Sequence, residues 1–600
     1  MEATTATSAH EASTGSRTIA DLMAIAAQKH ADRVALREKV DGEWRERTYA
    51  EVGEIVREIA LGLIDLGIAP GERVCILCTT RPEWTYADFA ISSSGAVVVP
   101  IYPTNSPEEC EWVVGNSEAC AVVCENAEQV AKIVAVRERL PKLRHIVVVD
   151  PSGEVADAIA LDDLRERGRG GDEGALRERM DAVSPEDPFT FIYTSGTTGP
   201  PKGCVLTHAN YRMVMNMAEG IDVVHTDEVV YLFLPLAHAF ALLVQLLTLD
   251  LGSTIAYFGG DTRNIIPEVG EVKPTYLPSV PRIFEKIYTL ATASLSDEDR
   301  AQLERAVALG VNVRDLQARG HDVPDELKGP FAKADERVFA KVRGIFGGNL
   351  RQAVSGAAPI APEILEFFYA SGVPVLEGYG MTETATVATY STIENHRFGT
   401  VGRALPGNEI RIAEDGEVLI KGPNIFSGYY RNDDASFGAV VDGWLHTGDL
   451  GTLDEDGYLK IVGRKKDIII TAGGKNLTPA NIENDIKQSR WVSQAVMHGD
   501  RRPYPVVLIT LDEEEIAQFA QERDLPQDIA ELSRRPEVRE LIQAEVDRAN
   551  ARYAQAEQVK KFAILDHDLS QETGELTPTL KVKRNIVNDK YADLFDSLYR

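Results

Sequence analysis

The chain has 600 residues, of which 44% are apolar, and it carries a formal net charge of -30 at pH 7. A chain of this length can bury several hydrophobic cores, and the length predicts about three or four structural units. The acidic balance argues against nucleic acid as a partner, because most of the surface would repel a phosphate backbone. We therefore expect a large soluble enzyme.

Residues 1–17 are rich in Ala, Ser, Thr and Glu and lack the apolar run of a signal peptide, so we expect a disordered tail. The six cysteines are too few for a disulfide scaffold. Cys75 and Cys78 form a C-x-x-C motif inside an apolar run, which favours a strand with thiols packed in the core over a metal or redox site. A reducing cytoplasm fits this cysteine usage.

Short apolar runs alternate with helical patterns along most of the chain. Examples are residues 74–78, 96–102, 146–150 and 373–380. This alternation predicts stacked α/β subdomains with largely parallel sheets. Towards the C-terminus, runs such as 505–511 and 562–566 alternate with charged helical stretches, which predicts a smaller α+β unit.

A loop of small hydroxylated residues and glycine follows the apolar run 189–193 and closes on Lys202. Such a backbone can approach phosphate oxygens closely, with N–H groups and hydroxyls as donors and the lysine as a point charge. A flexible surface loop is the ordinary alternative, but a loop at a strand end lies where α/β sheets bind ligands. The predicted phosphate-binding residues are Thr194, Ser195, Gly196, Thr197, Thr198 and Gly199.

The loop does not fit the ordinary P-loop pattern. Its glycines are too close together, and Pro200 and Pro201 disfavour a helix at the lysine. It instead resembles the phosphate loop of the adenylate-forming superfamily, which includes acyl-CoA synthetases, firefly-type luciferases and adenylation domains of peptide synthetases. Further motifs of that superfamily follow in order over most of the chain.

The resemblance implies a two-domain fold. Residues 18–465 would form an N-terminal domain of stacked α/β subdomains with a β-barrel-like part, and residues 466–600 would form a mobile α+β lid. The matching hinge residue is Lys466, which lies in a short charged segment where backbone torsions can change. An ordinary basic turn is the alternative for this segment.

Two segments resemble the superfamily's adenine and metal motifs. In residues 377–384, the resemblance implies that Tyr379 and Gly380 contact adenine, that Thr382 meets the α-phosphate, and that Glu383 holds Mg²⁺, which prefers oxygen ligands. Residues 355–359 resemble the segment that lies against the base, and they supply Gly356 and Ala357. Taken alone, Glu383 would read as a solvated loop carboxylate.

Further matches concern the ribose and the acyl group. Asp449 matches an aspartate that accepts hydrogen bonds from both ribose hydroxyls, and Arg464 would add a ribose or phosphate contact. His238 matches a histidine of the acyl pocket, although a buried structural histidine is the alternative. These roles come from the resemblance, since a Thr-Gly-Asp segment is common in turns.

The lid departs from the superfamily pattern. Many members end with a Gly-Lys whose lysine enters the site, but strict alignment puts Thr579 in that column here. Lys581 and Lys583 follow two and four residues later, on the same face of an extended segment. We expect Lys581 to be the catalytic lid lysine, and Gly473 and Gly474 to contact the arm of coenzyme A.

The apolar run 231–249 approaches the length of a membrane span. It contains Pro235, His238 and Gln245, so we expect a buried helix beside a hydrophobic pocket. Residues 276–288 resemble a long-chain acyl-CoA synthetase signature.

A charged helical insertion at about 291–347 follows this signature. Its first helix is predicted to begin with Ser296 and Asp299 in capping positions and to stop at Gly310. Apolar residues then recur at helical spacing in the rest of the insertion. They are Phe331, Val338, Val342 and Phe346.

These features predict an ATP-dependent long-chain fatty acid:CoA ligase that uses ATP, Mg²⁺ and coenzyme A. Two alternatives stay open: a fatty acyl-AMP ligase that loads a carrier protein, and a non-catalytic lipid-binding member whose unusual lid no longer supports adenylation. The sequence sets neither the oligomeric state nor the preferred chain length. It also leaves weak peripheral contact with membranes open.

Overall fold

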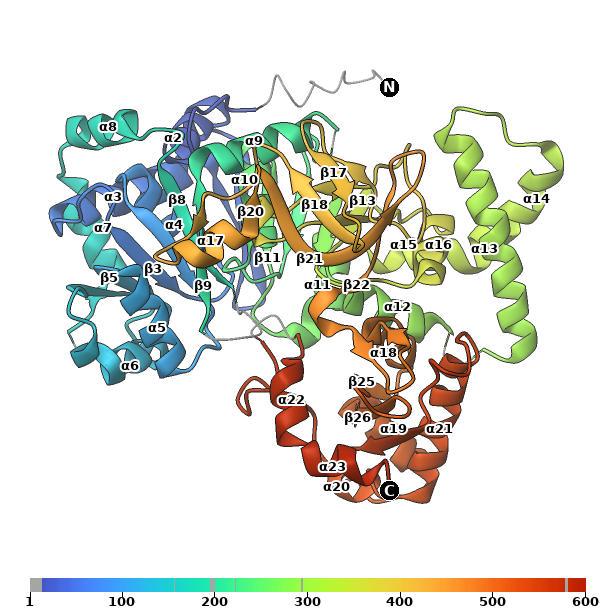
Figure 1. Cartoon of the computed structure of the whole chain (residues 1–600). Coiled ribbons are helices and arrows are strands. Elements are labelled where there is room, and N and C mark those ends of the chain that lie inside the picture. The colour runs from blue at the N-terminus through green and yellow to red at the C-terminus, as the bar shows by residue number, and fades with distance from the viewer. Residues whose placement is uncertain (1–12, 156, 195–199, 222, 293–294, 578–580) are drawn as a thin grey trace.

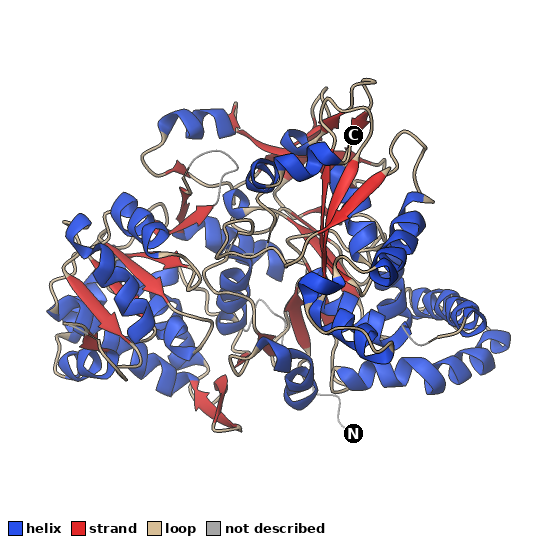
Figure 2. Ribbon diagram, turned by 90° about the horizontal axis from the view of Figure 1, so that it is seen from below, coloured by secondary structure: helices blue, strands red, loops and turns tan. Residues whose placement is uncertain are grey.

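The computed structural model describes residues 13–155, 157–194, 200–221, 223–292, 295–577 and 581–600. A large N-terminal body carries a smaller lid, drawn in orange and red, at its lower side (Figure 1). Helices cover the faces of the sheets in the large body (Figure 2). This arrangement confirms the predicted class of stacked α/β subdomains with a separate α+β lid.

Two largely parallel sheets form the centre of the large domain. The first runs in the order β19 (Gly428–Tyr429), β9 (Lys202–Thr207), β8 (Pro188–Thr194), β4 (Val97–Ile101), β3 (Arg73–Leu77), β5 (Ala121–Cys124), β6 (His145–Val148), β7 (Ile159–Ala160). The second runs in the order β16 (Arg403–Ala404), β15 (Thr389–Tyr390), β14 (Val375–Tyr379), β13 (Gln352–Ser355), β12 (Tyr276–Ser279), β10 (Val229–Leu232), β11 (Thr254–Tyr257), β1 (Val34–Val40), β2 (Glu43–Thr48).

A smaller antiparallel sheet supplies the barrel-like part of this domain. Its strands are β17 (Glu409–Ile412), β18 (Glu417–Lys421), β21 (Trp444–Leu453) and β20 (Val440–Val441), and β22 (Leu459–Arg464) pairs with β21. The helices around the three sheets are α2 (Ile19–Lys29), α3 (Tyr49–Asp65), α4 (Pro82–Ser93), α5 (Pro107–Ser117), α6 (Ala127–Val136), α7 (Leu161–Arg169), α8 (Glu173–Ala182), α9 (His208–Glu219), α10 (Ala239–Asp250), α11 (Ile265–Val272), α12 (Pro281–Thr292), α16 (Pro362–Ala370) and α17 (Asp433–Ala439).

The long apolar run at 231–249 divides between a strand and a helix. Its first part continues strand β10, and its second part forms α10, whose side chains are almost all buried. The predicted buried helix is therefore confirmed. No helix in the described part of the chain combines the length and the apolar character needed to cross a bilayer.

The cysteines behave as core residues. Cys75 and Cys78 are 0% and 3% exposed, and burial raises the pKa of both thiols well above the ordinary value. All six cysteines are free and buried. The predicted packing role of the C-x-x-C motif is confirmed.

Residues 13–17 differ from the expected disordered tail. The Ser13 hydroxyl donates to the Asp250 carboxylate at 2.7 Å, and the Thr14 amide donates to the Asp250 carbonyl at 3.1 Å. Asp250 is fully buried and also pairs with Arg212 at 3.1 Å. Composition suggested disorder because it does not reveal that a buried carboxylate 237 residues away accepts these donors. Residues 1–12 lie outside the described part of the chain.

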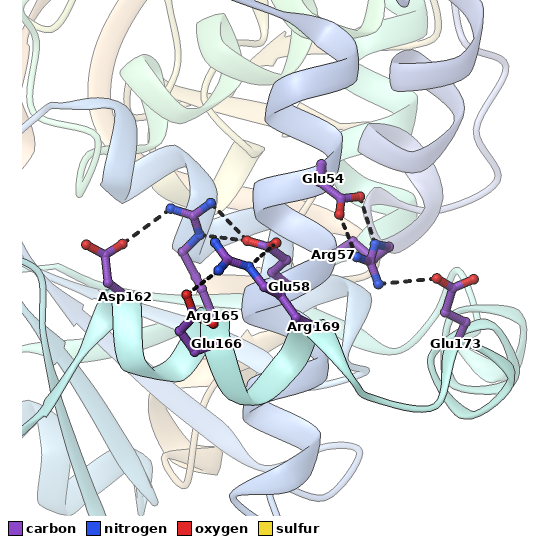
Figure 3. Close-up of polar contacts among 8 residues, drawn as sticks. All are labelled: Glu54, Arg57, Glu58, Asp162, Arg165, Glu166, Arg169 and Glu173. Atoms are coloured by element: carbon purple, nitrogen blue, oxygen red, sulfur yellow. Dashed lines mark hydrogen bonds and ion pairs between the residues drawn. The ribbon is translucent and has the colours of Figure 1, made fainter.

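An ion network joins α3 to α7 (Figure 3). Glu58, which is 4% exposed, accepts from Arg165 at 2.9 Å and from Arg169 at 2.8 Å. The helices can approach this closely because residue 168 is a glycine without a side chain. A Cβ at this position would lie 1.8 Å from the Glu58 carbonyl oxygen. A buried carboxylate needs such pairing, since an unpaired charge in the interior is costly.

The insertion is helical, as predicted, but its first helix is longer than expected. Ser296 caps the helix by accepting from the Asp299 amide at 3.2 Å, and the helix then runs through Gly310 to Ala318. Gly310 is a packing residue, because a Cβ there would lie 2.7 Å from the Ala370 Cβ on α16. The predicted stop at Gly310 is therefore wrong. The insertion contains α13 (Asp297–Ala318), α14 (Asp325–Ala334), the π-helix η3 (Asp335–Phe339) and α15 (Ala340–Ile345).

The lid has its own core and a mixed sheet. Strands β25 and β26 are antiparallel, and β26 and β27 are parallel. The strands of the lid are β23 (Ile469–Ile470), β24 (Asn476–Leu477), β25 (Val492–His498), β26 (Val506–Leu511) and β27 (Lys561–Ile564). The helices are α18 (Pro479–Lys487), α19 (Glu513–Glu522), α20 (Ile529–Leu532), α21 (Pro536–Asn550), α22 (Arg584–Lys590) and α23 (Ala592–Ser597).

We predict that Gly310→Ala destabilises the protein despite the better helix propensity of alanine. Overpacking against Ala370 and Phe339 would cost about 1–3 kcal/mol, which outweighs the roughly 1 kcal/mol that alanine contributes in a helix. The matched control is Gly344→Ala on α15, where an added Cβ meets nothing within 4 Å. Thermal unfolding should show a lower midpoint for the first variant alone, and equal midpoints would contradict this packing.

Candidate active site

Strands β8 and β9 hold the two ends of the predicted phosphate loop. They are antiparallel neighbours, and their last register pair is Thr194 with Lys202. The Thr194 hydroxyl donates to the Lys202 carbonyl at 3.5 Å. The other predicted loop residues lie outside the described part of the chain: Ser195, Gly196, Thr197, Thr198 and Gly199. The strand pair brings Lys202 back to the end of β8.

Lys202 and Glu383 both contact the side chain of Tyr429. The Lys202 amino group lies 5.1 Å from the centre of the Tyr429 ring, and the Tyr429 hydroxyl donates to Glu383 Oε1 at 2.7 Å. Burial and the Glu383 carboxylate raise the pKa of Tyr429, so the phenol keeps its proton as a donor. Glu383 is 7% exposed and follows Thr382 in the short 3₁₀ helix η4 (Thr382–Thr384). This burial excludes the alternative that Glu383 is a solvated loop carboxylate.

Asp449 is the centre of a second polar cluster. Its carboxylate accepts from the Tyr379 hydroxyl at 2.7 Å and pairs with Arg464 Nε at 3.0 Å. The pairing follows from the sheet, because Asp449 on β21 and Arg464 on β22 are register partners. Asp449 is 4% exposed. The structure thus brings together three predicted site residues from three separate sequence segments.

A cavity of about 290 Å³ opens beside this cluster. Three of its lining residues are basic, namely Arg464, Lys465 and Lys466, and the others are Thr447 and Gly448. Burial and the neighbouring Arg464 lower the pKa of Lys466. Lys465 is neutralised in part by Glu417, which it meets at 3.3 Å. The cavity is cationic in a protein whose net charge is strongly negative, so it suits an anionic ligand.

The lid places Lys581 at the same cluster. Burial and Arg464 lower the pKa of Lys581 to about 8, with Lys466 acting in the same direction and Asp449 opposing the shift. Lys581 is an exposed residue by its surface area, and desolvation by the protein around its amine is the largest cause of this change. Lys581 also contributes to the lowered pKa of His238, which lies at about 4 mainly through burial. The neighbours of Lys581 therefore come from both domains.

Two hydrogen bonds join Lys581 to Thr577 in the lid. The Thr577 amide donates to the Lys581 carbonyl at 2.8 Å, and the Lys581 amide donates to the Thr577 hydroxyl at 3.0 Å. Lys583 lies elsewhere, because its amine is 3.9 Å from Glu109 of the large domain. The structure thus separates the two candidate lysines, and Thr579 lies outside the described residues.

The remaining predicted residues have varied surroundings. His238 caps α10 by accepting from the Phe240 amide at 3.2 Å. Position 380 requires glycine, because a Cβ there would lie 2.1 Å from the Thr386 carbonyl oxygen. Gly356 and Ala357 follow the end of β13, and Ala357 has a left-handed φ of 67°. Gly356, Ala357 and Gly380 follow strand ends, as expected of an α/β ligand site, whereas His238 lies at the start of a helix.

Gly473 and Gly474 are not part of this cluster. They are exposed between β23 and β24 of the lid, and they do not line the cavity. Gly474 has a φ of 78°, which favours glycine. In this arrangement the lid presents Lys581 to the site and keeps the two glycines outside it.

Comparison with known families identifies the chain. The AMP-binding enzyme family matches residues 23–430, and the AMP-binding enzyme C-terminal domain matches residues 466–600. The chain belongs to the AMP-binding enzyme family. The resemblance seen in the sequence is therefore confirmed.

Two relatives illustrate the similarity within the AMP-binding enzymes. The long-chain-fatty-acid–CoA ligase FadD15 of Mycobacterium bovis is 40% identical and covers 95% of this chain and 94% of its own length. The long-chain-fatty-acid–CoA ligase ACSBG2 of Gallus gallus is 32% identical, with coverages of 97% and 81%.

Solved structures support the fold. The adenylation domain of a carboxylate reductase from Mycobacterium chelonae has a TM-score of 0.77 at 21% identity, covering 98% of this chain and 92% of that chain. The o-succinylbenzoate CoA synthetase from Bacillus subtilis, solved with ATP and magnesium ion, has a TM-score of 0.67 at 20% identity, with coverages of 94% and 98%. At these identities the likeness shows the fold alone.

Two residues of this AMP-binding enzyme escaped the sequence analysis. Glu377 is 8% exposed, burial raises its pKa to about 8, and its side chain accepts no hydrogen bond from the described residues. The sequence feature that could have identified Glu377 is a charged residue at the end of an apolar run typical of a strand. Tyr429 gave no comparable signal, because a tyrosine in a Gly-Tyr-Tyr segment is ordinary. Only the pairing of β19 with β9 reveals its place.

Glu383 fits a hard cation. Its carboxylate is buried and makes no ion pair with any described residue, while the Tyr429 hydroxyl occupies one of its oxygens. No group of three or more His, Cys, Asp or Glu is arranged for a metal within the described ranges. A Mg²⁺ ion here would therefore take its other ligands from phosphates and water, which is its usual habit in nucleotide sites.

We predict that Glu575→Gln destabilises the lid segment that leads to Lys581. Glu575 is fully buried and accepts from Lys590 and Tyr591, each at 2.6 Å. These hydrogen bonds lower the pKa of Glu575 to about 2 against the opposing effect of burial. The variant should unfold at a lower temperature than the wild type at neutral pH.

The pH dependence of this difference has a definite sign. A carboxylate with a lowered folded pKa stabilises the protein above its unfolded pKa, and the stabilisation is lost as pH falls towards the folded value. The gap in unfolding midpoint should therefore shrink as pH falls through about 4.5 towards about 2. The exposed Glu572 provides the control variant, Glu572→Gln. A gap that stays constant over this range would contradict the assignment.

Proposed function

We propose that this AMP-binding enzyme is an ATP-dependent long-chain fatty acid:CoA ligase. A fatty acid carboxylate would attack the α-phosphorus of ATP, forming an acyl-adenylate and releasing pyrophosphate. The thiol of coenzyme A would then attack the carbonyl carbon, release AMP and lose its proton. The observation that carries the proposal is the cluster of Tyr379, Asp449 and Arg464 beside a cationic cavity, in a chain whose 40% identical relative is a long-chain-fatty-acid–CoA ligase.

The first step needs charge compensation more than a protein nucleophile. The triphosphate is highly anionic, and negative charge builds up on the departing pyrophosphate. Lys202 at the loop and Lys581 from the lid would stabilise that charge, with the Thr382 hydroxyl as a neutral donor. Mg²⁺ bound at Glu383 would supply further Lewis-acid neutralisation of the phosphates.

Asp449 has capacity for the ribose of ATP. A carboxylate offers about four lone-pair sites, and two are used by Tyr379 and Arg464. The ribose hydroxyls can therefore donate to the remaining sites without breaking the existing cluster. The hydrogen bond from the Tyr379 hydroxyl to Asp449 fixes the Tyr379 ring. This ring would form the platform for adenine beside Gly380, Gly356 and Ala357.

The acyl group needs an apolar wall, which α10 provides. Its side chains are buried, and Phe240 at its start approaches Gly356 at the candidate adenine side. Each buried methylene contributes about 0.8 kcal/mol, so a long chain provides much of the binding energy. His238 at the cap of α10 would lie between the acyl pocket and the adenylate carbonyl.

The second step would use another lid orientation. Lys466 at the hinge would absorb the rotation, and Gly473 and Gly474 would then contact the arm of coenzyme A. The non-catalytic alternative rested on the unusual lid sequence, and the position of Lys581 argues against it. The carrier-protein alternative differs only in the thiol acceptor, so an experiment must separate it.

The proposal is tested by two linked assays on the purified chain. We expect ATP–pyrophosphate exchange that depends on palmitate and is weak with acetate, because the short acid lacks the buried methylenes. Adding coenzyme A should then produce palmitoyl-CoA. Absence of exchange would exclude both ligase readings, whereas exchange without thioester would favour a carrier protein as the acceptor.

We predict that Lys581→Ala lowers acyl-adenylate formation by well over tenfold, on the order of the loss seen when one transition-state donor is removed. Thioester formation from supplied acyl-adenylate should remain close to the wild-type rate, because that step no longer needs the triphosphate neutralised. Lys583→Ala is the matched control, since its amine faces Glu109 instead. An unchanged first step in Lys581→Ala would contradict the role.

The lowered pKa of Lys581 also predicts a pH profile. The free enzyme should lose the positive charge of this lysine as pH rises through about 8. The kcat/KM for ATP in the exchange reaction should therefore fall above that pH. Lys581→Arg keeps its charge throughout and should lack this decline, even at a lower overall rate. A wild-type profile that stays flat to pH 10 would contradict the assignment.

A further inference from the structure

Tyr429 lies between the two opposite charges of the candidate phosphate and metal site. Its hydroxyl donates to Glu383 Oε1 at 2.7 Å, while the face of its ring receives the Lys202 amine at 5.1 Å from the centre. One side chain thus contacts a carboxylate with its edge and an ammonium with its face. Aromatic rings support both contacts, since the face is negative and the phenol is a donor.

The fold holds this ring in place. Strand β19 pairs with β9 so that Tyr429 is the register partner of Cys204, two residues after Lys202. The Ser436 hydroxyl of α17 accepts from the Tyr429 amide at 2.8 Å. Phe426 packs edge-on against the ring at 4.9 Å, and the Phe426 amide donates to the Glu383 carbonyl at 2.9 Å. The backbone of Glu383 is therefore tied to the segment that carries the tyrosine.

The charges on either side of the ring are not paired with each other. In the part of the chain that the structure describes, neither Lys202 nor Glu383 forms an ion pair. Direct pairing would neutralise both groups, and each would then have to break that pair before it could meet phosphate or metal. Breaking an ion pair in a partly buried site is costly. A neutral group that contacts both charges avoids that cost.

We propose that Tyr429 is a positioning residue that keeps Lys202 and Glu383 in one site without letting them pair. Its hydroxyl fixes the carboxylate of Glu383 for a divalent cation, and its ring holds the Lys202 ammonium ready for phosphate. The inference deepens the proposed function and rests on it. Neighbours that orient a metal-binding carboxylate typically change metal affinity or activity by about 10–100-fold when they are removed.

Two substitutions separate the two contacts. Tyr429→Phe removes the hydroxyl and keeps the ring, whereas Tyr429→Leu removes both. The matched control is Tyr430→Phe, because the adjacent ring packs on Phe191 at 4.6 Å and lies outside the site. The direct readout is Mn²⁺ binding, followed by electron paramagnetic resonance in the presence of α,β-methylene-ATP. The kinetic readouts are exchange with palmitate and thioester formation from supplied palmitoyl-AMP.

We expect Tyr429→Phe to bind Mn²⁺ about tenfold more weakly and to need correspondingly more Mg²⁺ for half-maximal exchange. Binding of metal-free nucleotide and thioester formation should stay at the wild-type values. Tyr429→Leu should weaken metal-free nucleotide binding as well, since Lys202 can then turn towards Glu383. Tyr430→Phe should match the wild type in every assay.

Several outcomes would overturn the role of Tyr429. They are wild-type Mn²⁺ affinity in Tyr429→Phe, equal losses in Tyr429→Phe and Tyr430→Phe, or equal losses in both half-reactions, which indicate a structural defect. Failure of the proposed function would look different. The wild type would then show no palmitate-dependent exchange, while a weakened Mn²⁺–nucleotide complex in Tyr429→Phe would still support the positioning role.

Discussion

The charge balance around Asp449 is the constraint on which the candidate site depends. One buried carboxylate faces Arg464 directly. Burial and Arg464 lower the pKa of both Lys466 and Lys581, and Asp449 opposes the two shifts. Three cations, Arg464, Lys465 and Lys466, line the adjoining cavity, while the carboxylates of Asp467 and Glu383 also act on Lys466. Bringing cations together in a partly buried place is unfavourable by itself, because desolvation disfavours each of them. A polyanionic ligand would offset that cost, which supports the proposal that this cavity receives phosphate.

The lid completes this cluster through contacts that are easily broken. Arg282 on α12 meets Asp512 at 2.7 Å, and Arg552 meets Glu363 of the large domain at 2.9 Å. Three of these four side chains are 45–48% exposed and Asp512 is 21% exposed, and exposed pairs contribute about 0–1 kcal/mol each. In the proposed two-step reaction, these pairs would therefore oppose a rotation of the lid only weakly.

The sequence was most informative about features that a few neighbouring residues determine. The strand before the phosphate loop, the buried helix α10 and the cap at Ser296 each follow from a run of neighbouring residues, and the structure has all three. Asp449 and Tyr379 could be named only through the family resemblance, since no local pattern predicts that residues 70 positions apart share a hydrogen bond.

Long-range packing explains what the sequence could not show. Gly310 looked like a helix end because glycine is a common terminator, yet it lies inside the helix to admit Ala370. Ser13 looked disordered because its partner Asp250 is distant in the chain. Tyr429 carried no signal at all, since its meaning comes from the pairing of β19 with β9. In each case the deciding contact joins segments that the sequence separates.

The contrast between the surface and the site explains how an acidic protein can bind anionic substrates. ATP, a fatty acid and coenzyme A are all negative, and a net charge of -30 repels them at long range. At physiological ionic strength this repulsion is screened beyond about 8 Å. Contacts within the cavity are much shorter, so the cations that line it, Arg464, Lys465 and Lys466, would act on a bound phosphate almost unscreened. In the proposed site, binding would thus depend on the few cations that the fold gathers, and the many surface carboxylates would act only at long range.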